Sequence, residues 1–463
     1  MSCFLLLLCL HSVLGSGSSP VADDWKYDVI HRKRGVPLRG LIVEQTSQHV
    51  RIRCVIRRPG SPTVLFPEIV AREEIARLEL LGPEDRAVLE SRLETLRRER
   101  QQLSEQLLAL DPTRRNNHRF EEKLDLQSTS WPGDNKTQAL SYQSAHFTLI
   151  ANARPELVQL VAIHLEQVYA AYVRSLPPRT TKAERTTILL TRSLAEYQAL
   201  ARSRGLNLFN PAFYDPVRNQ VVCGSDLERL YVELEQIAAH HAQQRLRIKE
   251  TRAELHRIYR GKVPAELLAP LNDADKRMTL VEQRNAAALK RARERLFQRL
   301  YHEAFHAYLG AFVFPGKANA LPIWLNEGLA QLFETAIVEA GELRIDHVDP
   351  NRRLAMRAAL AEGKLLPLTE LLTSQPQHFQ VARVAEQQVS DRYYLAAWAL
   401  AFYLTFEQKI INSPALDDYV RALERGTDPL PAFAQLVGQN PVAFEKQFNR
   451  YLSRLRADGR TEG

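Results

Sequence analysis

The chain has 463 residues, of which 45% are hydrophobic, so it can bury a sizeable core and is expected to fold as more than one unit. Its formal charge of +8 would attract polyanions, but the basic residues alternate with acidic ones along the predicted helices. Such diffuse basicity is typical of a solvated surface and is a weak signal for nucleic-acid binding. We therefore expect no nucleic-acid partner.

The first 19 residues, "MSCFLLLLCLHSVLGSGSS", form a short apolar run that ends in small residues, although no Lys or Arg precedes it. This pattern predicts a secretory signal peptide over residues 1–19 and an exported protein, periplasmic, on the cell surface or secreted. A buried N-terminal strand or a mis-assigned start is the alternative. No later run of about 18 apolar residues occurs, so no membrane span is expected after the signal. Beyond residue 19 only Cys54 and Cys223 remain, too few for a disulfide framework.

Residues 25–81 contain short β-branched runs separated by Gly, Pro and polar turns, which predicts a small β module. The stretch "RGVPLRGLIVEQTSQHVRIR" resembles the strand-turn-strand core of Sm-like or SH3-like barrels, although another kind of small β module fits as well. From Pro83 to about Leu110, leucines at helical spacing predict an amphipathic helix. The Pro-, Asn- and Ser-rich residues 111–140 then indicate a linker, so that residues 83–140 form a helix and linker.

A second globular unit is predicted over residues 141–455. It begins with two strands separated by a helix that starts at Pro155, followed by a short helix that ends at Gly205. Two further strands are expected in "AFYDPVRNQVVCGS", which together make a small mixed sheet with helices on it. Everything after residue 320 is predicted to be mostly helical. The expected fold class is α+β.

Residues 226–260 and 276–314 predict two long helices joined by "GKVPAELLAPLNDAD". The natural interpretation is an antiparallel helical hairpin, a helical arm over about residues 226–300. A coiled-coil-like arm of this kind is suited to binding a protein partner or to self-association.

Near the end of the second arm, "QRLYHEAFHAYLG" carries His302, Glu303 and His306. Residues four apart lie on one face of a helix, so the two histidines can bind one Zn²⁺. The carboxylate of Glu303 can then act as a general base toward a zinc-bound water. The motif supplies two ligands and a base but lacks a third ligand, and two exposed histidines on a charged helix are the alternative.

The segment "LPIWLNEGLAQLFE", residues 321–334, supplies a candidate for that ligand. Pro322 predicts a helix start, and Glu327 stands among apolar and small residues, where a carboxylate is costly unless a cation or a metal pairs with it. We expect Glu327 to be the third ligand, rather than an exposed helix residue or a charge favoured by the helix N-terminus. Gly328 is expected to let this helix approach the zinc helix. Glu334 lies two turns on and could orient a zinc-binding histidine, or it could be an ordinary surface glutamate.

Together, "HEAFH" and "WLNEGLA" resemble the gluzincin zinc metallopeptidases of the thermolysin-like clan, in particular the peptidase MA-like bacterial domains. The resemblance covers residues 302–334 and, loosely, the order of elements from about 141 to 455. It implies a small mixed sheet over a helical zinc-binding subdomain, with a peptide substrate antiparallel to an edge strand. It also implies an oxyanion-stabilising Tyr on a later helix, and Tyr394 in "RYYLAAWALAFYL" is the match. Plain core packing is the alternative for Tyr394, and the long helical hairpin is an insertion that the family core lacks.

The sequence therefore predicts an exported zinc-dependent metalloendopeptidase that acts on a peptide or protein substrate. Zn²⁺ bound by His302, His306 and Glu327 would activate a water, Glu303 would take its proton, and Tyr394 would stabilise the oxyanion. The alternative is a non-catalytic zinc-binding or scaffold protein that uses the peptidase-like fold and the helical arm for protein interaction.

Overall fold

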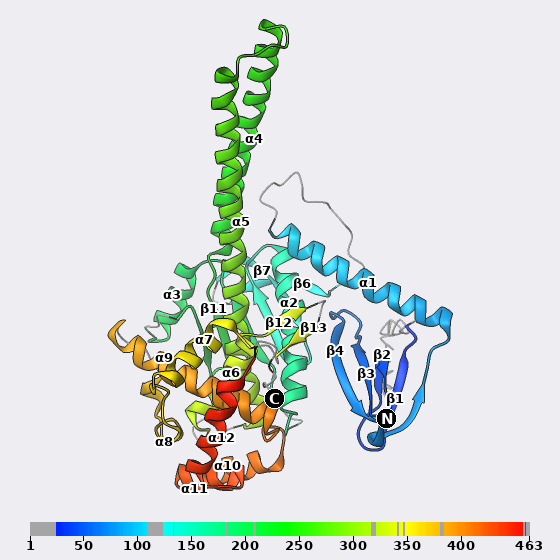
Figure 1. Cartoon of the computed structure of the whole chain (residues 1–463), viewed down its shortest axis with the longest axis vertical. Helices are drawn as coiled ribbons and strands as arrows, with labels where there is room; N and C mark the ends of the chain where they lie inside the picture. Colours follow the sequence, from blue (N-terminus) through cyan, green and yellow to red (C-terminus); the bar gives the residue numbers. More distant parts are fainter. Residues whose placement is uncertain are drawn as a thin grey trace, which may run out of the picture.

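A computed structural model describes residues 25–108, 124–132, 134–180, 183–206, 210–315, 321–339, 342–345, 348–379, 384–456 and 459. The signal peptide predicted over residues 1–19 lies outside them. Helices and sheets both contribute, so the chain has a mixed α+β fold (Figure 1). None of the helices in the described part of the chain is long and apolar enough to cross a membrane.

The first sheet lies within residues 25–81, where the sequence predicts a small β module. Its five antiparallel strands have the order β4-β3-β2-β1-β5. Alternate side chains of the strands face inward and form a small apolar cluster with Ile30, Ile42 and Ile52 fully or almost fully buried. The strands are β1 (Asp28–Arg32), β2 (Leu38–Gln45), β3 (His49–Ile56), β4 (Val64–Ala71) and β5 (Ile75–Glu79), with a 3-10 turn η1 (Arg72–Glu74) before β5.

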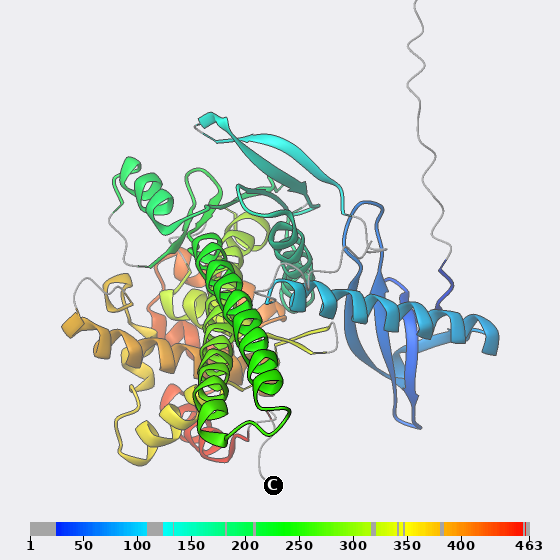
Figure 2. The ribbon, with the colours of Figure 1, turned by 90° about the horizontal axis from the view of Figure 1, so that it is seen from above.

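Helix α1 (Pro83–Gln106) follows this sheet and agrees with the helix predicted from Pro83. Three of its leucines, Leu89, Leu93 and Leu96, are buried against side chains of the five-stranded sheet. Leu103, near the other end of the helix, is buried in the main core of the molecule. The helix therefore links the first sheet to the rest of the chain, as the view from above shows (Figure 2).

The second sheet has six strands in the order β10-β11-β9-β8-β7-β6, with parallel pairs β8–β9 and β9–β11 and antiparallel pairs elsewhere. The strands are β6 (Leu126–Trp131), β7 (Asp134–Gln143), β8 (Phe147–Ala151), β9 (Thr186–Leu190), β10 (Ala212–Asp215) and β11 (Gln220–Cys223). Strand β10 is one edge of this sheet and β6 is the other.

Strands β6 and β7 contradict the second half of the linker predicted over residues 111–140, whose residues 111–123 lie outside the described part of the chain. They form a hairpin whose turn follows Trp131, and their sequences are rich in Ser, Thr, Asn and Gln. Strand β6 lies at the sheet edge and most of its side chains are exposed or half-buried, so polar residues are tolerated there. The sequence lacked the apolar alternation that marks a half-buried strand, and the globular unit begins earlier than residue 141.

Helices cover both faces of the six-stranded sheet. The inward side chains of one face, among them Leu149 and Ile188, share a core with α2 (Pro155–Ser175) and α5 (Ala265–Tyr308). The other face packs against α3 (Leu194–Ser203), which contributes Tyr197 and Ala201 to a smaller cluster. The end of α5, where the sequence motif lies, is thus fixed under the sheet near β10 and β11.

Helices α4 (Leu227–Ile258) and α5 form the predicted hairpin, which protrudes from the globular body (Figure 1). Arg245 on α4 joins the two arms through the carboxylates of Asp275 and Glu282, at 3.0 and 2.7 Å. The expected connection over "GKVPAELLAPLNDAD" is mostly wrong, because α5 already begins at Ala265. Pro270 removes one hydrogen bond in the second turn of α5, near the tip of the arm, and the helix continues past it.

The rest of the chain is mostly helical, as predicted. Its elements are the π-helical turn η3 (Leu309–Val313), α6 (Ile323–Glu334), the hairpin strands β12 (Ile337–Glu339) and β13 (Glu342–Arg344), α7 (Pro350–Ala361), α8 (Leu368–Leu372), η4 (Pro376–His378), α9 (Val384–Phe402), η5 (Tyr403–Glu407), α10 (Pro414–Glu424), α11 (Pro429–Val437) and α12 (Pro441–Arg454). Fully buried Trp324 on α6 and Trp398 on α9 anchor these helices in the core.

The role expected for Gly328 needs a correction. A Cβ added at Gly328 would crowd the main chain of Ala397 and would lie 3.0 Å from the Cβ of Ala401, and both residues are on α9. The glycine therefore permits the close approach of α6 to α9, not to the histidine-bearing helix α5.

Candidate metal centre

His302 and His306 lie on the last two turns of α5. Their neighbours Tyr301, Phe305 and Tyr308 are buried in the core, which leaves the histidines on a face directed toward α6. The two imidazole rings have centroids 4.7 Å apart and are nearly perpendicular. The four-residue spacing on a well-packed helix thus brings both rings to one place, as the sequence predicts.

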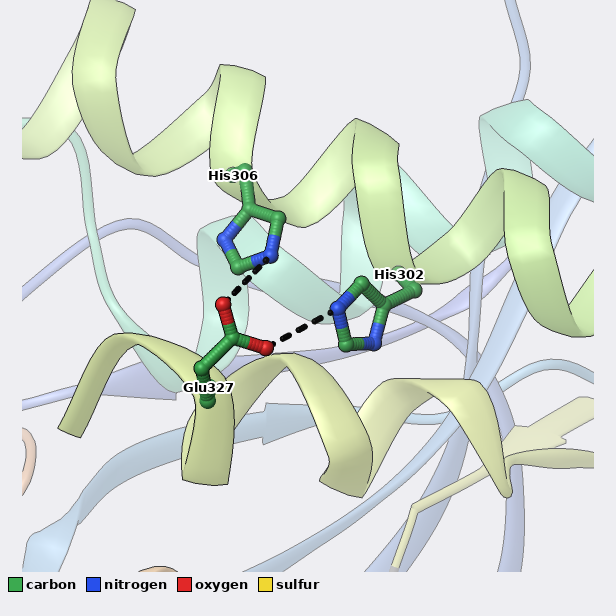
Figure 3. A group of neighbouring side chains, drawn as sticks. All are labelled: His302, His306 and Glu327. Carbon is green, nitrogen blue, oxygen red and sulfur yellow. Dashed lines mark ion pairs between the residues drawn. The ribbon is translucent and has the colours of Figure 1, made fainter. Parts of the chain in front are cut away.

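Glu327 reaches this place from α6. Its carboxylate lies between the two imidazoles, with Oε2 3.2 Å from Nε2 of His302 and Oε1 3.6 Å from Nε2 of His306 (Figure 3). One ligand atom from each residue lies within 4.8 Å of the other two. The three side chains are only 13–15% exposed, so they are largely shielded from bulk water.

This donor set fits a zinc ion. Bonds of about 2.0–2.1 Å in a tetrahedron place neighbouring ligand atoms roughly 3.3 Å apart, close to the two distances at Glu327. Oε2 of Glu327 is buried and has no well-aligned hydrogen bond among the described residues, although a nitrogen lies nearby. A buried carboxylate oxygen without a donor is costly, and a cation between the three side chains would remove that cost.

Each histidine has a partner on its other ring nitrogen. Nδ1 of His306 lies 2.9 Å from Oδ1 of Asn326, and Nδ1 of His302 lies 3.4 Å from Oε2 of Glu334. Glu334 is itself bound by Arg352 at 3.1 Å. Such contacts fix the ring orientation and leave both Nε2 atoms turned toward Glu327.

The carboxylates of Glu327 and Glu334 favour a positive charge within the cluster. Burial lowers the pKa of His302, but the carboxylates of Glu327 and Glu334 more than offset it and hold this pKa well above its usual value. Burial raises the pKa of Glu327, whereas His306 and His302 lower it to a net value below normal. The two carboxylates thus favour a positive charge between them, and a divalent cation bound to the neutral imidazoles would supply that charge.

Glu303 lies beside this cluster but points to the sheet. Its side chain is 7% exposed, and its carboxylate accepts a hydrogen bond from the backbone N–H of Tyr214 on edge strand β10. Burial raises the pKa of Glu303, and the positive charge of His302 and His306 offsets only part of that rise. The carboxyl group therefore takes up a proton more readily than an exposed glutamate.

Tyr394 on α9 lies within the electrostatic reach of the site. Burial raises the pKa of its phenol, and the carboxylates of Glu327, Glu303 and Glu334 raise it further. Among the described residues its hydroxyl has no hydrogen-bond partner. The neighbouring Tyr393 differs, because its hydroxyl donates to Oε1 of Glu370 at 2.8 Å. Of the two tyrosines, only Tyr394 interacts electrostatically with the carboxylates of the centre.

The structure thus brings the six site residues predicted from the sequence close to one another. They are His302, Glu303, His306, Glu327, Glu334 and Tyr394. Sequence reasoning missed Asn326 and Arg352. Asn326 adjoins Glu327 and offered a signal, since an amide next to a candidate ligand could have been tested for contact with a histidine. Arg352 offered none, because it is one of many arginines in the chain and follows the β12–β13 hairpin.

Comparison with known proteins adds little about function. A family model described as a protein of unknown function, DUF1570, matches residues 298–421. The match spans the centre from His302 to Tyr394 and about a quarter of the chain. No curated protein and no solved structure matches the chain.

Proposed function

We propose that the chain is a zinc-dependent metallopeptidase of the gluzincin type, with His302, His306 and Glu327 as the zinc ligands. One observation carries the proposal. The three potential ligands converge from two helices, while Glu303 of the same motif lies buried between them and the edge strand β10. A structural zinc site would be closed by a fourth protein ligand, and the cluster of metal-binding side chains found in the described residues has three members.

A zinc ion held there would act as a Lewis acid toward a peptide carbonyl and lower the pKa of a bound water. Glu303 is the base: its carboxylate takes a proton from the attacking water and returns it to the leaving amine. Burial raises the pKa of Glu303, which makes its carboxylate a stronger base than that of an exposed glutamate.

Tyr394 is the proposed oxyanion donor. A phenol with a raised pKa keeps its proton at neutral pH and can donate a hydrogen bond to the oxygen that becomes negative during attack. Arg352 is not proposed as this donor, because its guanidinium already pairs with the carboxylate of Glu334. Glu334 and Asn326 position the two imidazoles and are not expected to contact substrate.

The edge position of strand β10 supports a peptide as the proposed substrate. This strand is paired on one side with β11, and Tyr214 directs its N–H away from that partner toward Glu303. An extended peptide can add to such an edge through main-chain hydrogen bonds. An antiparallel peptide there would pass directly over the base and the metal ligands, in the manner that the gluzincin resemblance implies.

Other features of the chain fit this proposal as accessory parts. The protruding arm of α4 and α5 and the five-stranded sheet are proposed to recruit or position a protein partner. Export, with removal of residues 1–19, is likewise part of the proposal.

Metal analysis and a cleavage assay test the function together. The purified wild-type chain should contain one zinc per chain and cleave casein, and removal of zinc with a chelator should abolish cleavage until zinc is restored. Glu327→Ala should lower the zinc content strongly. A wild-type chain that binds no zinc, or that binds it without cleaving casein or a pool of peptides, would favour the non-catalytic alternative.

A further inference from the structure

A cavity of about 730 Å³ lies where α1, α2 and α5 meet, and it extends to the C-terminal end of α6. Cavities of this size hold drug-sized organic ligands. Glu334 lines the cavity, but the three candidate zinc ligands, Glu303 and Tyr394 do not. The cavity is therefore a second site, separate from the proposed peptidase centre.

Four cationic side chains line this cavity from two helices. Arg97 and Arg100 belong to α1, and Lys290 and Arg293 belong to α5. Arg293 joins the two helices, because its Nη1 donates to the carbonyl oxygen of Ser104 at 2.7 Å. Among the described residues this is the one hydrogen bond of the half-buried Arg293 side chain, which forms no ion pair. Its other nitrogens therefore remain as donors for an anion in the cavity.

The carboxylates around the cavity already have other partners. They are Glu105, Glu294, Glu334 and Asp349. Glu334 pairs with Arg352 at 3.1 Å, and Asp349 accepts a hydrogen bond from the backbone N–H of Arg352 at 2.8 Å. Glu105 accepts from the Gln101 amide at 2.8 Å, and Glu294 lies 3.9 Å from Lys290 in an exposed pair. None of the four forms an ion pair with Arg293.

An apolar wall stands beside these cations. Phe297 on α5 is buried and stacks on the ring of His164, with centroids 4.0 Å apart. Leu160 and Ile163 on α2 are buried and line the same cavity. Burial, together with the charge of nearby guanidinium groups, lowers the pKa of His164 to about 3, so this imidazole is uncharged at neutral pH. The wall can therefore pack against an aromatic or aliphatic group.

We propose that this cavity binds an organic anion, in which an aromatic or other apolar body carries a carboxylate or a phosphate group. The charged group would bind Arg293, with Lys290 and Arg97 adding positive charge, and the body would pack against Phe297. A guanidinium can bind either kind of anion through two parallel hydrogen bonds. Such a site would operate with or without peptidase activity.

Calorimetry on the full chain at neutral pH tests the site with naphthyl phosphate, naphthoate, uncharged naphthol and inorganic phosphate. The two naphthyl anions should bind roughly 10- to 100-fold more tightly than naphthol. Inorganic phosphate should bind more weakly than naphthyl phosphate, because it lacks the apolar body. Comparison of naphthoate with naphthyl phosphate shows which anionic group the cavity prefers. Equal binding of naphthol and both anions, or of the two phosphates, overturns the proposal.

Variants with matched controls locate the bound anion. Arg293→Gln should weaken binding of the naphthyl anions at least about 10-fold, but it also removes a contact between α1 and α5. Lys290→Gln and Arg97→Gln change side chains that are more than half exposed and should weaken binding roughly 2- to 5-fold. Their exposed neighbours Arg291 and Arg98 do not line the cavity, so Arg291→Gln and Arg98→Gln should keep the wild-type affinity.

The outcome in Lys290→Gln and Arg97→Gln decides the proposal even where Arg293→Gln does not fold. Wild-type affinity in both variants, or an equal loss in the two controls, places the anion elsewhere and overturns the proposal.

Zinc removal excludes the remaining explanation, since carboxylates and phosphates can also bind a metal ion. A chain stripped of metal by a chelator and then dialysed should bind the naphthyl anions with unchanged affinity. Loss of binding in the stripped chain would assign the probes to the metal and overturn the proposal. Binding retained in a chain that cleaves no peptide would support the anion site while counting against the proposed function.

Discussion

Gly328 lies so close to Ala397 that a Cβ at position 328 would be 2.9 Å from the Ala397 carbonyl carbon. The pair fixes the distance between α6, which carries Glu327, and α9, which carries Tyr394. Gln331 strengthens the same junction, because its side-chain amide donates to the carbonyl oxygen of Tyr394 at 3.0 Å. The candidate ligand and the candidate oxyanion donor therefore depend on one helix contact.

Gly328→Ala should destabilise the fold and weaken zinc binding together. The added methyl group meets backbone, which cannot rotate away, so we expect a loss of roughly 1–3 kcal/mol in unfolding free energy. Urea unfolding and zinc titration measure the two effects. Gly310→Ala is the matched control, because its Cβ would meet only ordinary contacts, with Oη of Tyr214 at 3.5 Å. Equal stability of the two variants would contradict the account.

Glu334→Gln should weaken zinc binding without removing a ligand. The carboxylate contacts Nδ1 of His302, and loss of such a contact typically costs 10- to 100-fold in metal affinity. Competition with a chromophoric chelator measures the change. Glu362→Gln is the control, because Glu362 is exposed and pairs with Lys364. An unchanged zinc affinity in Glu334→Gln would show that Glu334 is not needed to orient His302.

Tyr394→Phe should lower kcat with zinc retained. Loss of one donor to a developing oxyanion costs on the order of 10²–10³ in kcat. Tyr393→Phe removes the neighbouring hydroxyl, which is already bound to Glu370, so this variant should keep nearly the wild-type kcat. Steady-state kinetics on one quenched peptide compare the two. A larger loss in Tyr393→Phe would reverse the assignment.

The local parts of the centre could be predicted from the sequence. His302, Glu303 and His306 lie within two turns of one helix, and Glu327 was conspicuous as a carboxylate among apolar residues. The contact of Arg352 with Glu334 depends on tertiary packing and has no local pattern.

Two predictions about the fold were wrong because they depended on tertiary packing. Strand β6 is polar because it is an exposed edge, and its hairpin partner β7 is also rich in polar residues, so a rule based on apolar alternation overlooks both strands. Gly328 was correctly recognised as a point of close approach, but a sequence does not say which helix approaches, and α9 lies some 70 residues farther along.

His164 predicts a pH dependence of stability. In the folded chain, burial lowers the pKa of His164 to about 3, with the nearby guanidinium groups of Arg293 and Arg100 acting in the same direction. An unfolded histidine has a pKa of about 6.5. Above pH 6.5 the imidazole is neutral in both states. Below pH 6.5 the unfolded chain binds a proton that the folded chain does not, so stability falls as the pH falls toward 3.

The free energy of unfolding should therefore be lower at pH 5 than at pH 7.5, and His164 should account for roughly 2 kcal/mol of that difference. Urea unfolding of wild type and His164→Gln at the two pH values isolates the contribution of His164. The variant should lose less stability between pH 7.5 and pH 5 than the wild type. Equal losses would mean that His164 titrates alike in the folded and unfolded chain.

The most direct test of the central claim compares the wild type with Glu303→Gln at equal zinc content. Glutamine keeps the size of the side chain and removes its ability to accept a proton, while His302, His306 and Glu327 are untouched. We predict that both proteins hold one zinc per chain and that only the wild type cleaves casein. Cleavage by Glu303→Gln at the wild-type rate would contradict the proposed mechanism.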